Sequence, residues 1–437
     1  MRNKKNVYFM YEPYECSALE EYFEAMAESG WLIKSINRPF LSFERIEPKK
    51  LKFSVDILNK ISSYDPEDSD DALDYREYCE AAGWNYVCQD KKIQVFYTED
   101  YNSTIDIQTD EGEKFKSVVK ASLGNVFSYI LTVALWVFLI WITLRRGDIS
   151  YDITSNVMIA TLVSVCIGMV IYVSKIISFI IWFFKARKQV KDNKSMPYNN
   201  YKQVKIKNSL SIFHILIWMG VYCFLLIRDE SNYEKGNGVL VILMILAVII
   251  SVFVARYIRK KRYSRETNIT LTISGAVVAI FVLLIFTGVS ISIDALNEDN
   301  INEIAKTKSN LTISDFGYKE NESDFYGDYQ KSILAERIYY SNRDENNSLS
   351  YTVLNSKYPW IVELQENRIT EWVSRFEEDL KIRNTSLPSN IRVYSDKENE
   401  AYIFVTQNRV VDMHINLSRI DKDEFLDIVY EKLLKEN

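Results

Sequence analysis

Apolar residues gather in five long runs near the middle of the chain, and these runs give the first predicted elements. A helix needs roughly 20 apolar residues to cross a hydrocarbon layer about 30 Å thick. The fourth run has no charged residue in 18 positions, whereas the second is the longest and contains Lys175. We therefore predict a five-helix transmembrane bundle, with spans at residues 123–144, 157–184, 209–227, 238–255 and 269–293.

Shorter patterns of apolar and polar residues precede the first span. Four apolar residues between Leu19 and Met26 recur at helical spacing, with Ser17 in the place of an N-cap and Gly30 as a stop. Residues 51–58 instead alternate, as a strand with one buried face does. We predict helices at residues 17–30 and 70–83, and strands at residues 6–11, 31–36, 40–46, 51–58, 84–88 and 93–99.

These elements form two copies of one β-α-β-β unit. A shift of 53 residues brings five pairs of identical residues into register: Tyr22/Tyr75, Glu24/Glu77, Gly30/Gly83, Trp31/Trp84 and Phe43/Phe96. Each glycine can adopt the left-handed conformation that ends a helix, where a side chain costs about 1 kcal/mol. Each tryptophan then starts a strand and can pack against the completed helix. We interpret both Gly-Trp pairs as structural, and expect one shared sheet with both helices on one face, an α+β arrangement.

The residues after the last span also mix helical and strand patterns. Pro359 can open a helix that extends to residue 382, and the last helix, residues 421–436, begins with Asp421 and Glu424 at the spacing of a capping box. Strands are predicted at residues 332–341, 348–355, 391–395, 400–406 and 410–417, the first two joined by a polar loop at 342–347. The predicted domains are a duplicated α+β domain (1–122), the spans (123–293) and a second α+β domain (294–437).

Charge separates the same three parts. The formal net charge is −8 over residues 1–122, +12 over residues 123–293 and −10 over residues 294–437. The connections between spans two and three and between spans four and five hold eight and six basic residues. Because cytosolic connections are rich in Lys and Arg, we expect the first domain in the cytosol and the last outside the cell membrane. Arg145 and Arg146 fall on the opposite side and are the exception.

The basic connections also bear on partners. Next to apolar spans they suit anionic lipid headgroups, at about 1 kcal/mol per charge, and so we expect the lipid bilayer as a partner and no direct binding of nucleic acid. The basic N-terminus is followed by an apolar stretch of only about five residues, shorter than a secretory signal requires. This feature too indicates a cytosolic N-terminus.

Motifs for catalysis or cofactor binding are missing from the sequence. The 13 glycines form no Gly-x-Gly-x-x-Gly motif or P-loop, and no CxxC or HExxH occurs. His414 and Asp412 share one face of a strand, a weak metal signal without further ligands. Cys79 and Cys88 are expected as buried thiols, and the acidic run at residues 65–74 as a solvated loop that lacks calcium-site spacing. We expect no enzymatic activity, no cofactor and no metal.

Two polar residues inside apolar runs are candidate intramembrane residues. Lys175 interrupts the second span, and a charge there is either functional or close enough to the headgroups for its amine to reach them. His214 lies near the cytosolic end of the third span, where it is either a polar contact between helices or part of a proton relay.

The duplicated unit resembles a known bacterial family. The segments "EYFEAMAESGWLIKS", "FLSFERIEP", "KFSVDIL", "YREYCEAAGWNYVC" and "VFYTE", within residues 4–100, are similar to the domain of unknown function 2812. The resemblance implies an association with PadR-type transcriptional regulators, and it carries no catalytic residues.

We therefore expect a membrane-bound signalling or regulatory adaptor whose cytosolic domain binds a protein partner, and the family resemblance implies a PadR-type regulator as that partner. The alternative is an accessory component of a membrane transport system. The sequence shows no inverted repeat or discontinuous span that would favour a self-sufficient carrier. It indicates no particular oligomeric state.

Overall fold

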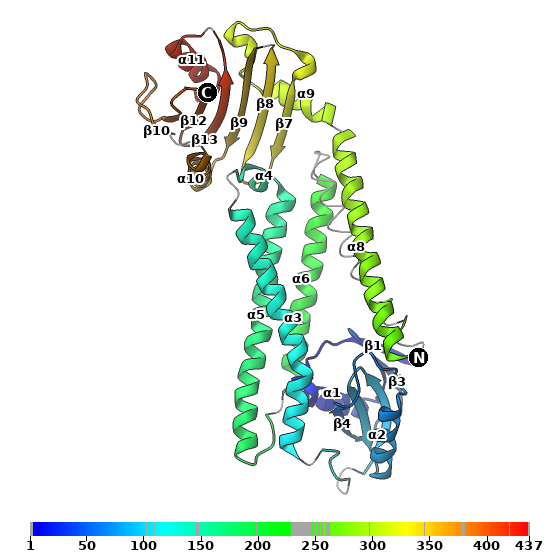
Figure 1. The fold of residues 1–437 in the computed structure, drawn as a ribbon. Coiled ribbons are helices and arrows are strands. Elements are labelled where there is room, and N and C mark those ends of the chain that lie inside the picture. The colour runs from blue at the N-terminus through cyan, green and yellow to red at the C-terminus, as the bar shows by residue number, and fades with distance from the viewer. Residues whose placement is uncertain are drawn as a thin grey trace. The chain divides into compact units, whose positions relative to one another are not determined.

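The computed structural model describes residues 3–435, apart from residues 101–103, 109, 146–147, 198, 297, 345, 377–380 and 419 and most of residues 229–262. The chain has a mixed α/β N-terminal region with small sheets, then long apolar helices, then a sheet-rich C-terminal region (Figure 1). This order agrees with the predicted fold class.

The N-terminal region contains the two predicted β-α-β-β copies. The first comprises β1 (Lys4–Tyr8), α1 (Cys16–Glu28), β2 (Trp31–Asn37) and β3 (Phe40–Arg45), with a short 3₁₀ turn, η1 (Pro13–Glu15), before α1. The second comprises β4 (Lys52–Ile57), α2 (Asp70–Ala81), β5 (Asn85–Asp90) and β6 (Ile93–Thr98). Gly30 and Gly83 follow the two helices with φ of 80° and 88°, the left-handed conformation that glycine adopts without strain.

The expectation of one shared sheet is wrong, because each copy forms its own three-stranded antiparallel sheet. The strand orders are β1-β3-β2 and β4-β6-β5. The edge strands β2 and β5 lie near each other without forming a ladder. Both carry a register shift at matching positions, between Ile33 and Ser35 and between Tyr86 and Cys88. A bulge bends and twists an edge strand, which explains why these two edges do not pair.

Helix α1 links the two copies by covering an edge of the second sheet. The Glu20 carboxylate accepts a hydrogen bond from the Val55 backbone N–H at 2.8 Å, and Glu24 accepts one from Phe53 at 3.3 Å. The two glutamates are four residues apart on the helix, and the two amides are two apart on β4, so the spacings match. These bonds satisfy donors that an edge strand would otherwise present to another chain.

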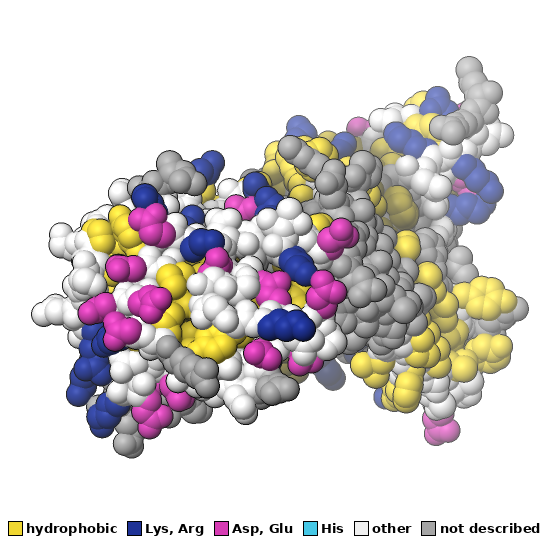
Figure 2. Space-filling view, turned by 90° about the horizontal axis from the view of Figure 1, so that it is seen from above, with side chains coloured by type: hydrophobic (Ala, Val, Ile, Leu, Met, Phe, Trp, Pro, Cys, Tyr) yellow, Lys and Arg dark blue, Asp and Glu magenta, His cyan; other side chains and the backbone are white. Residues whose placement is uncertain are grey.

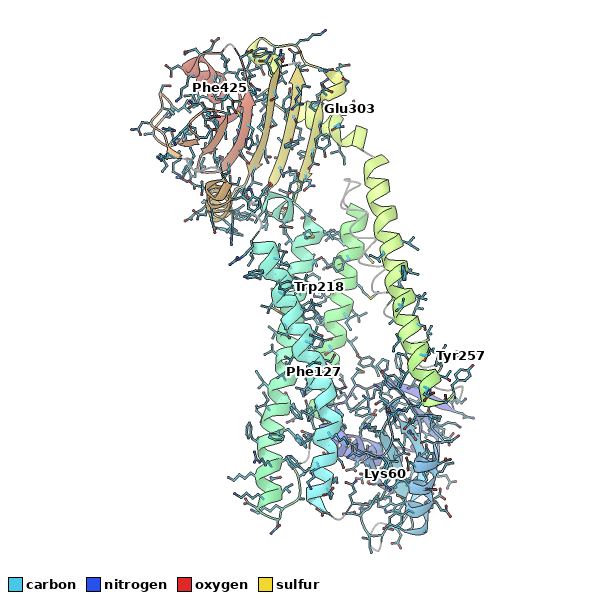
Figure 3. The ribbon with its side chains drawn as sticks, in the orientation of Figure 1. Lys60, Phe127, Trp218, Tyr257, Glu303 and Phe425 are labelled. Atoms are coloured by element: carbon cyan, nitrogen blue, oxygen red, sulfur yellow. The ribbon has the colours of Figure 1, made fainter. Side chains whose placement is uncertain are left out.

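Three long helices follow that are apolar enough to cross a membrane. They are α3 (Glu111–Leu144), α5 (Asn156–Lys191) and residues 201–225 of α6 (Tyr201–Arg228). Apolar side chains such as Phe127 are exposed along them, as lipid contact requires (Figure 3). The fifth predicted span lies within another long helix, α8 (Arg265–Leu296), and the fourth, residues 238–255, lies largely outside the described residues. Among the described residues, three of the five predicted spans thus lie in helices that are long and apolar enough to cross a membrane, and the count of five is not confirmed.

The C-terminal region is built on a seven-stranded antiparallel sheet of order β10-β11-β12-β13-β9-β8-β7. Its strands are β7 (Tyr326–Lys331), β8 (Glu336–Asp344), β9 (Asn347–Asn355), β10 (Lys381–Ile382), β11 (Arg392–Ser395), β12 (Ala401–Val405) and β13 (Arg409–Asn416). Its helical elements are α9 (Glu298–Lys308), η2 (Ile313–Phe316), η3 (Glu322–Asp324), α10 (Pro359–Phe376), α11 (Lys422–Val429) and η4 (Tyr430–Leu434).

Each predicted C-terminal element has a counterpart, but the helix expected over residues 359–382 ends at Phe376, with residues 381–382 in a strand, and the strand expected from residue 332 begins at Glu336. Pro359 opens α10, and Asp421 caps α11 by accepting a hydrogen bond from the Asp423 N–H. The sequence did not predict β7, β10 or α9, and the turn after β8 is tighter than the loop expected at residues 342–347. The Gly and Asp residues in β7 weaken its strand signal, which explains that omission.

Helices cover both faces of this sheet. Tyr402 and Phe404 of β12 belong to the core that includes Phe425 of α11, whose position is shown in Figure 3. Ile403 and Val405 of the same strand pack in the cluster that contains Val362 of α10. Figure 2 shows one face of this region, where Asp and Glu side chains are interspersed with Lys and Arg.

Candidate functional site

The segment between β1 and α1 lies against the apolar helices of the N-terminal region. The Tyr14 ring is 5.8 Å from Phe179 and 5.6 Å from Trp182, measured between centroids, and both partners are on α5. Tyr14, Phe179 and Trp182 are all buried. The apolar end of α5 therefore packs into the core of the N-terminal α/β region, which explains why the second apolar run is longer than a membrane needs.

Glu12 places a carboxylate among polar groups of α3 and α5. It accepts hydrogen bonds from the Tyr129 hydroxyl at 2.6 Å and from the Asn125 amide at 3.0 Å. The Lys175 ammonium lies 3.5 Å from the same carboxylate and 5.0 Å from the centroid of the Tyr129 ring. The predicted intramembrane candidate Lys175 thus has an anionic partner from the N-terminal α/β region, and its charge is compensated.

Glu15 makes the second ionic contact, with α6. The Glu15 side chain is only about 5% exposed, and Lys207 donates to its carboxylate at 3.0 Å. The other carboxylate oxygen accepts the backbone N–H of Glu12 at 3.0 Å, within a capping box around η1. We call the six residues Glu12, Glu15, Asn125, Tyr129, Lys175 and Lys207 the polar joint.

The basic connection between α5 and α6 also lies against the first copy. The Asn199 amide donates to the Tyr14 carbonyl at 2.6 Å, and the Asn199 backbone N–H donates to the Ser17 hydroxyl at 3.0 Å. Ser17 is therefore not the N-cap that the sequence suggested: α1 begins at Cys16, and the Ser17 hydroxyl accepts a bond from the connection instead. On α6, Asn208 donates to the Met10 carbonyl at 2.9 Å.

A small cavity lies beside the polar joint. It measures about 40 Å³, room for about three water molecules, and its wall includes Tyr14, Glu20, Lys114 and Trp182. Burial raises the pKa of Glu20 to about 7, while nearby Lys114 acts in the opposite direction. A carboxyl that titrates near neutral pH thus lies between α1, β4 and the first apolar helix.

The polar joint residues lie at matching distances from the far ends of their helices. About 20 residues separate Asn125 from the end of α3, Lys175 from the start of α5 and Lys207 from the end of α6. At 1.5 Å per residue each stretch is about 30 Å long, the thickness of a hydrocarbon core. The contacts with residues 10–15 therefore fall where a headgroup layer would begin.

The two copies differ in what their helices expose. Helix α1 buries its apolar side chains, which include Leu19, Tyr22, Phe23 and Met26. In α2 only Ala72, Arg76 and Cys79 are buried, whereas Tyr78 is 71% exposed and Leu73 is 46% exposed. Five exposed carboxylates share this helix: Asp70, Asp71, Asp74, Glu77 and Glu80. We call these five together with Leu73 and Tyr78 the α2 face.

The interior of the second copy is held by buried polar contacts. The Arg76 guanidinium donates to Gln89 and to the Glu67 carbonyl, each at 2.6 Å, and lies 3.9 Å from the Tyr86 ring centroid. Trp84 is buried with Cys79 and Phe96, so it packs against the helix that precedes it. Trp31 instead lies near two cations, Lys5 and Arg45.

The remaining candidate residues have the following surroundings in the structure. His214 lies beside Trp218 with a ring distance of 6.2 Å. His414 and Asp412 are 3.8 Å apart on an exposed strand position. Among the residues that the structure describes, no three His, Cys, Asp or Glu side chains gather as metal ligands. Cys79 and Cys88 are buried free thiols, as predicted.

The sequence analysis missed most of the polar joint. It identified Lys175 but not Glu12, Glu15, Asn125 or Tyr129. The signal available was the pair of glutamates in the aromatic segment "YEPYE" and two polar residues four apart at the start of the first span. That spacing places Asn125 and Tyr129 on one helix face, which predicts a shared contact without naming it.

The fold and the polar joint define a class: apolar helices that could span a membrane, joined to a duplicated α/β domain. Residues 16–131 match the family model described as protein of unknown function (DUF2812). The match confirms the resemblance and extends it into α3, so that it includes Asn125 and Tyr129 but not Glu12. No curated protein and no solved structure matches the chain.

Proposed function

We propose that this protein is a multi-span membrane adaptor whose duplicated domain binds a basic protein partner in the cytosol. The α2 face carries the proposal. It combines two exposed apolar side chains, Leu73 and Tyr78, with five carboxylates on one short helix. The carboxylates lie between these two apolar side chains on the helix surface, and such a mixture suits a partner whose binding surface is cationic.

The matching surface of the first copy is already used inside the molecule. Glu20 and Glu24 on α1 bind β4, and Tyr14 and Tyr22 pack beside the apolar helices. The second copy has Leu73 and Glu77 at the positions of Glu20 and Glu24, and both are exposed. The duplication thus supplies one copy for attachment and one for recognition.

A DNA-binding regulator is the partner that we favour. Proteins that hold DNA present Lys and Arg to the phosphates, so an acidic helix can compete for that surface. A PadR-type regulator, which the family resemblance implies, would be of this kind. The adaptor would then retain the regulator at the membrane, away from its operator.

The membrane placement belongs to the same proposal. The cell membrane would hold α3, α5 and α6, with the polar joint at its cytosolic headgroups and the C-terminal region outside. The density of Lys and Arg in the connections supports this orientation. In intact cells, a membrane-impermeant maleimide should label a cysteine introduced at Ile382 and leave one at Lys188 unlabelled; the reverse pattern would exclude the orientation.

Photocrosslinking tests the partner. A photoreactive phenylalanine analogue at Tyr78 should capture a DNA-binding regulator in cells that express the full chain. The matched control is the same analogue at Phe40, an exposed aromatic residue of the first copy. Equal capture from both positions, or none from Tyr78, would contradict the α2 face as the binding surface.

The transport alternative is an outcome of the same experiment. If the analogue at Tyr78 captures the ATPase or the permease subunit of an exporter and no regulator, the chain is an accessory component of a transport system.

A variant with a charge-reversed α2 face, in which Asp71, Asp74 and Glu77 are changed to Lys, should no longer bind a regulator, because the attraction is electrostatic.

A further inference from the structure

A second contact holds the C-terminal region to the start of α5. The Asn156 side chain accepts the Ile333 backbone N–H at 3.0 Å, and the Ser332 hydroxyl donates to the Ile153 carbonyl at 2.6 Å. Thr154 donates to Gln330 at 3.1 Å, and Gln365 donates to Asp148 at 2.8 Å. We call these eight residues the C-terminal joint. They fix the turn between β7 and β8 beside the first residue of an apolar helix.

An apolar side chain projects from that turn. Ile333 is 70% exposed, although its backbone is bonded and its neighbours Leu334 and Ala335 pack inward. Its exposure is therefore a consequence of an ordered turn. An isoleucine side chain exposed to solvent does not stabilise the domain. Ile333 lies next to Asn156, the first residue of the apolar helix α5.

Aromatic and basic residues continue the same surface. The Ser356 hydroxyl donates to the Leu334 carbonyl at 2.8 Å, which brings the segment before α10 to the turn. There Lys357 is exposed, Tyr358 is half-buried, and Trp360 is 55% exposed with its ring 6.4 Å from Tyr358. We call Ile333, Lys357, Tyr358 and Trp360 the interfacial patch.

We infer that the interfacial patch is immersed in the headgroup layer of the bilayer around α5. Tryptophan and tyrosine prefer this layer because their rings are apolar at one end and polar at the other, and lysine reaches the phosphates. Ile333 enters the edge of the hydrocarbon. The inference rests on the proposed insertion of α5, but not on which side of the membrane the C-terminal region occupies.

The composition of α10 limits the depth of this contact. Beyond Trp360 the exposed residues of the helix include Glu363, Asn367 and Glu371. Carboxylates are costly in the hydrocarbon core, so only the first turn of α10 can enter the layer. The lipid contact therefore adds an anchor at one edge of the domain and leaves the rest of the sheet in water.

The opposite edge of the sheet provides a matched control. Ile382 on β10 is 64% exposed, nearly as much as Ile333, and β10 and β7 are the two edge strands. Phe127 on α3 is an exposed apolar residue of a proposed span. The three positions represent three environments. Ile382 is expected in water, Ile333 in the headgroup layer and Phe127 in lipid.

Spin-label accessibility tests the inference on the full chain in vesicles of phosphatidylethanolamine and phosphatidylglycerol. The exposed Cys166 and Cys223 are first changed to Ala, since the other three cysteines are buried. Cysteine is then introduced singly at Phe127, Ile333 or Ile382 and labelled. Collision with oxygen reports lipid, and collision with a water-soluble nickel chelate reports water.

The label at Ile333 should give an oxygen-to-nickel collision ratio several-fold above that at Ile382 and below that at Phe127. A ratio at Ile333 equal to that at Ile382, with Phe127 in lipid, overturns the inference and leaves the membrane placement intact. A label at Phe127 in water overturns the membrane placement itself. Spin–spin broadening at Ile333 that grows with the protein-to-lipid ratio would identify a second copy as the occupant and also overturn the inference.

Discussion

The polar joint and the C-terminal joint use different chemistry to hold the two sheet-containing regions to apolar helices. In the polar joint, two glutamates from the N-terminal segment meet Lys175 and Lys207, and the carboxylates are largely buried. In the C-terminal joint, hydroxyl and amide groups supply most of the contacts, as at Ser332 and Asn156. Helix α5 takes part in both, since it begins at Asn156 and contains Lys175.

This difference determines how each joint can respond to its surroundings. A buried carboxylate depends on its cationic partner, because removal of that partner leaves a charge without compensation. A neutral hydrogen bond contributes about 1 kcal/mol and changes little with pH or salt. The polar joint is thus the one that depends on charge compensation, and its two glutamates come from the domain proposed to bind the partner.

The largest effect is expected at Glu15. Changing Lys207 to Met should destabilise the polar joint by about 2–3 kcal/mol, because a carboxylate buried to about 95% keeps only a backbone donor. Amide exchange of Glu15 measures the opening. Changing Lys205, which is exposed on the same helix, to Met is the control and should have no effect. A Glu15→Gln change in the Lys207→Met background should restore part of the loss.

A smaller loss is expected at Lys175. Its change to Met should cost about 1–2 kcal/mol, because Glu12 keeps the Tyr129 and Asn125 donors. The free energy of opening can be followed by exchange of the Met10–Glu15 amides in nanodiscs. Lys185→Met, at an exposed position of α5, is the matched variant. If both changes cost the same, the pair with Glu12 contributes nothing.

Glu20 predicts a pH dependence of the N-terminal region. Its pKa is raised from 4.5 to about 7 by burial, with Glu24 and Asp56 acting in the same direction and Lys114 in the other. Between those values the native state binds more protons than the unfolded state, so stability falls as the pH rises through this range. After allowance for solvent screening, the free energy of unfolding falls by at most about 2 kcal/mol over this pH range.

The Glu20→Gln variant checks this sign. It keeps an acceptor for the Val55 N–H and removes the titrating group, so exchange at Val55 should lose most of its dependence on pH between 4.5 and 7. The amide of Ile333 in the C-terminal joint serves as the internal reference. An unchanged slope at Val55 in the variant would assign the effect to another group.

The smallest effect is expected in the C-terminal joint. Changing Asn156 to Ala removes the acceptor for the Ile333 N–H and should cost about 1 kcal/mol, measured by exchange of that amide. Ser174→Ala is the control, because that hydroxyl donates only within α5, to the Ile171 carbonyl. A loss as large as that of Lys207→Met would remove the distinction between the two joints.

Much of the local structure could be predicted from the sequence. The spacing of Leu19, Tyr22 and Met26 indicates α1, and Gly30 and Gly83 mark where the two helices end. The strand runs are recognised from alternating or β-branched residues, and the apolar helices from length alone. These features depend on residues within one or two turns of each other, where propensity and periodicity act directly.

Strand β7 and helix α9 could not be predicted in this way. Their residues carry weak local signals, and contacts with neighbouring elements stabilise them. The backbone N–H of Gly327 in β7, for example, donates a hydrogen bond to the side-chain oxygen of Asn302 in α9 at 2.8 Å. Elements of this kind are stabilised by contacts that local periodicity does not encode.

By itself, the sequence determined the duplicated unit, the apolar helices and the charge of each part, since these follow from composition and short-range pattern. Only the tertiary structure decided that the copies form two sheets, that α1 is buried while α2 is exposed, and that Glu15 meets Lys207. That last pair is 192 residues apart along the chain. On sequence grounds Lys205 and Lys207, both on α6, could reach a glutamate equally well, and only packing selects Lys207.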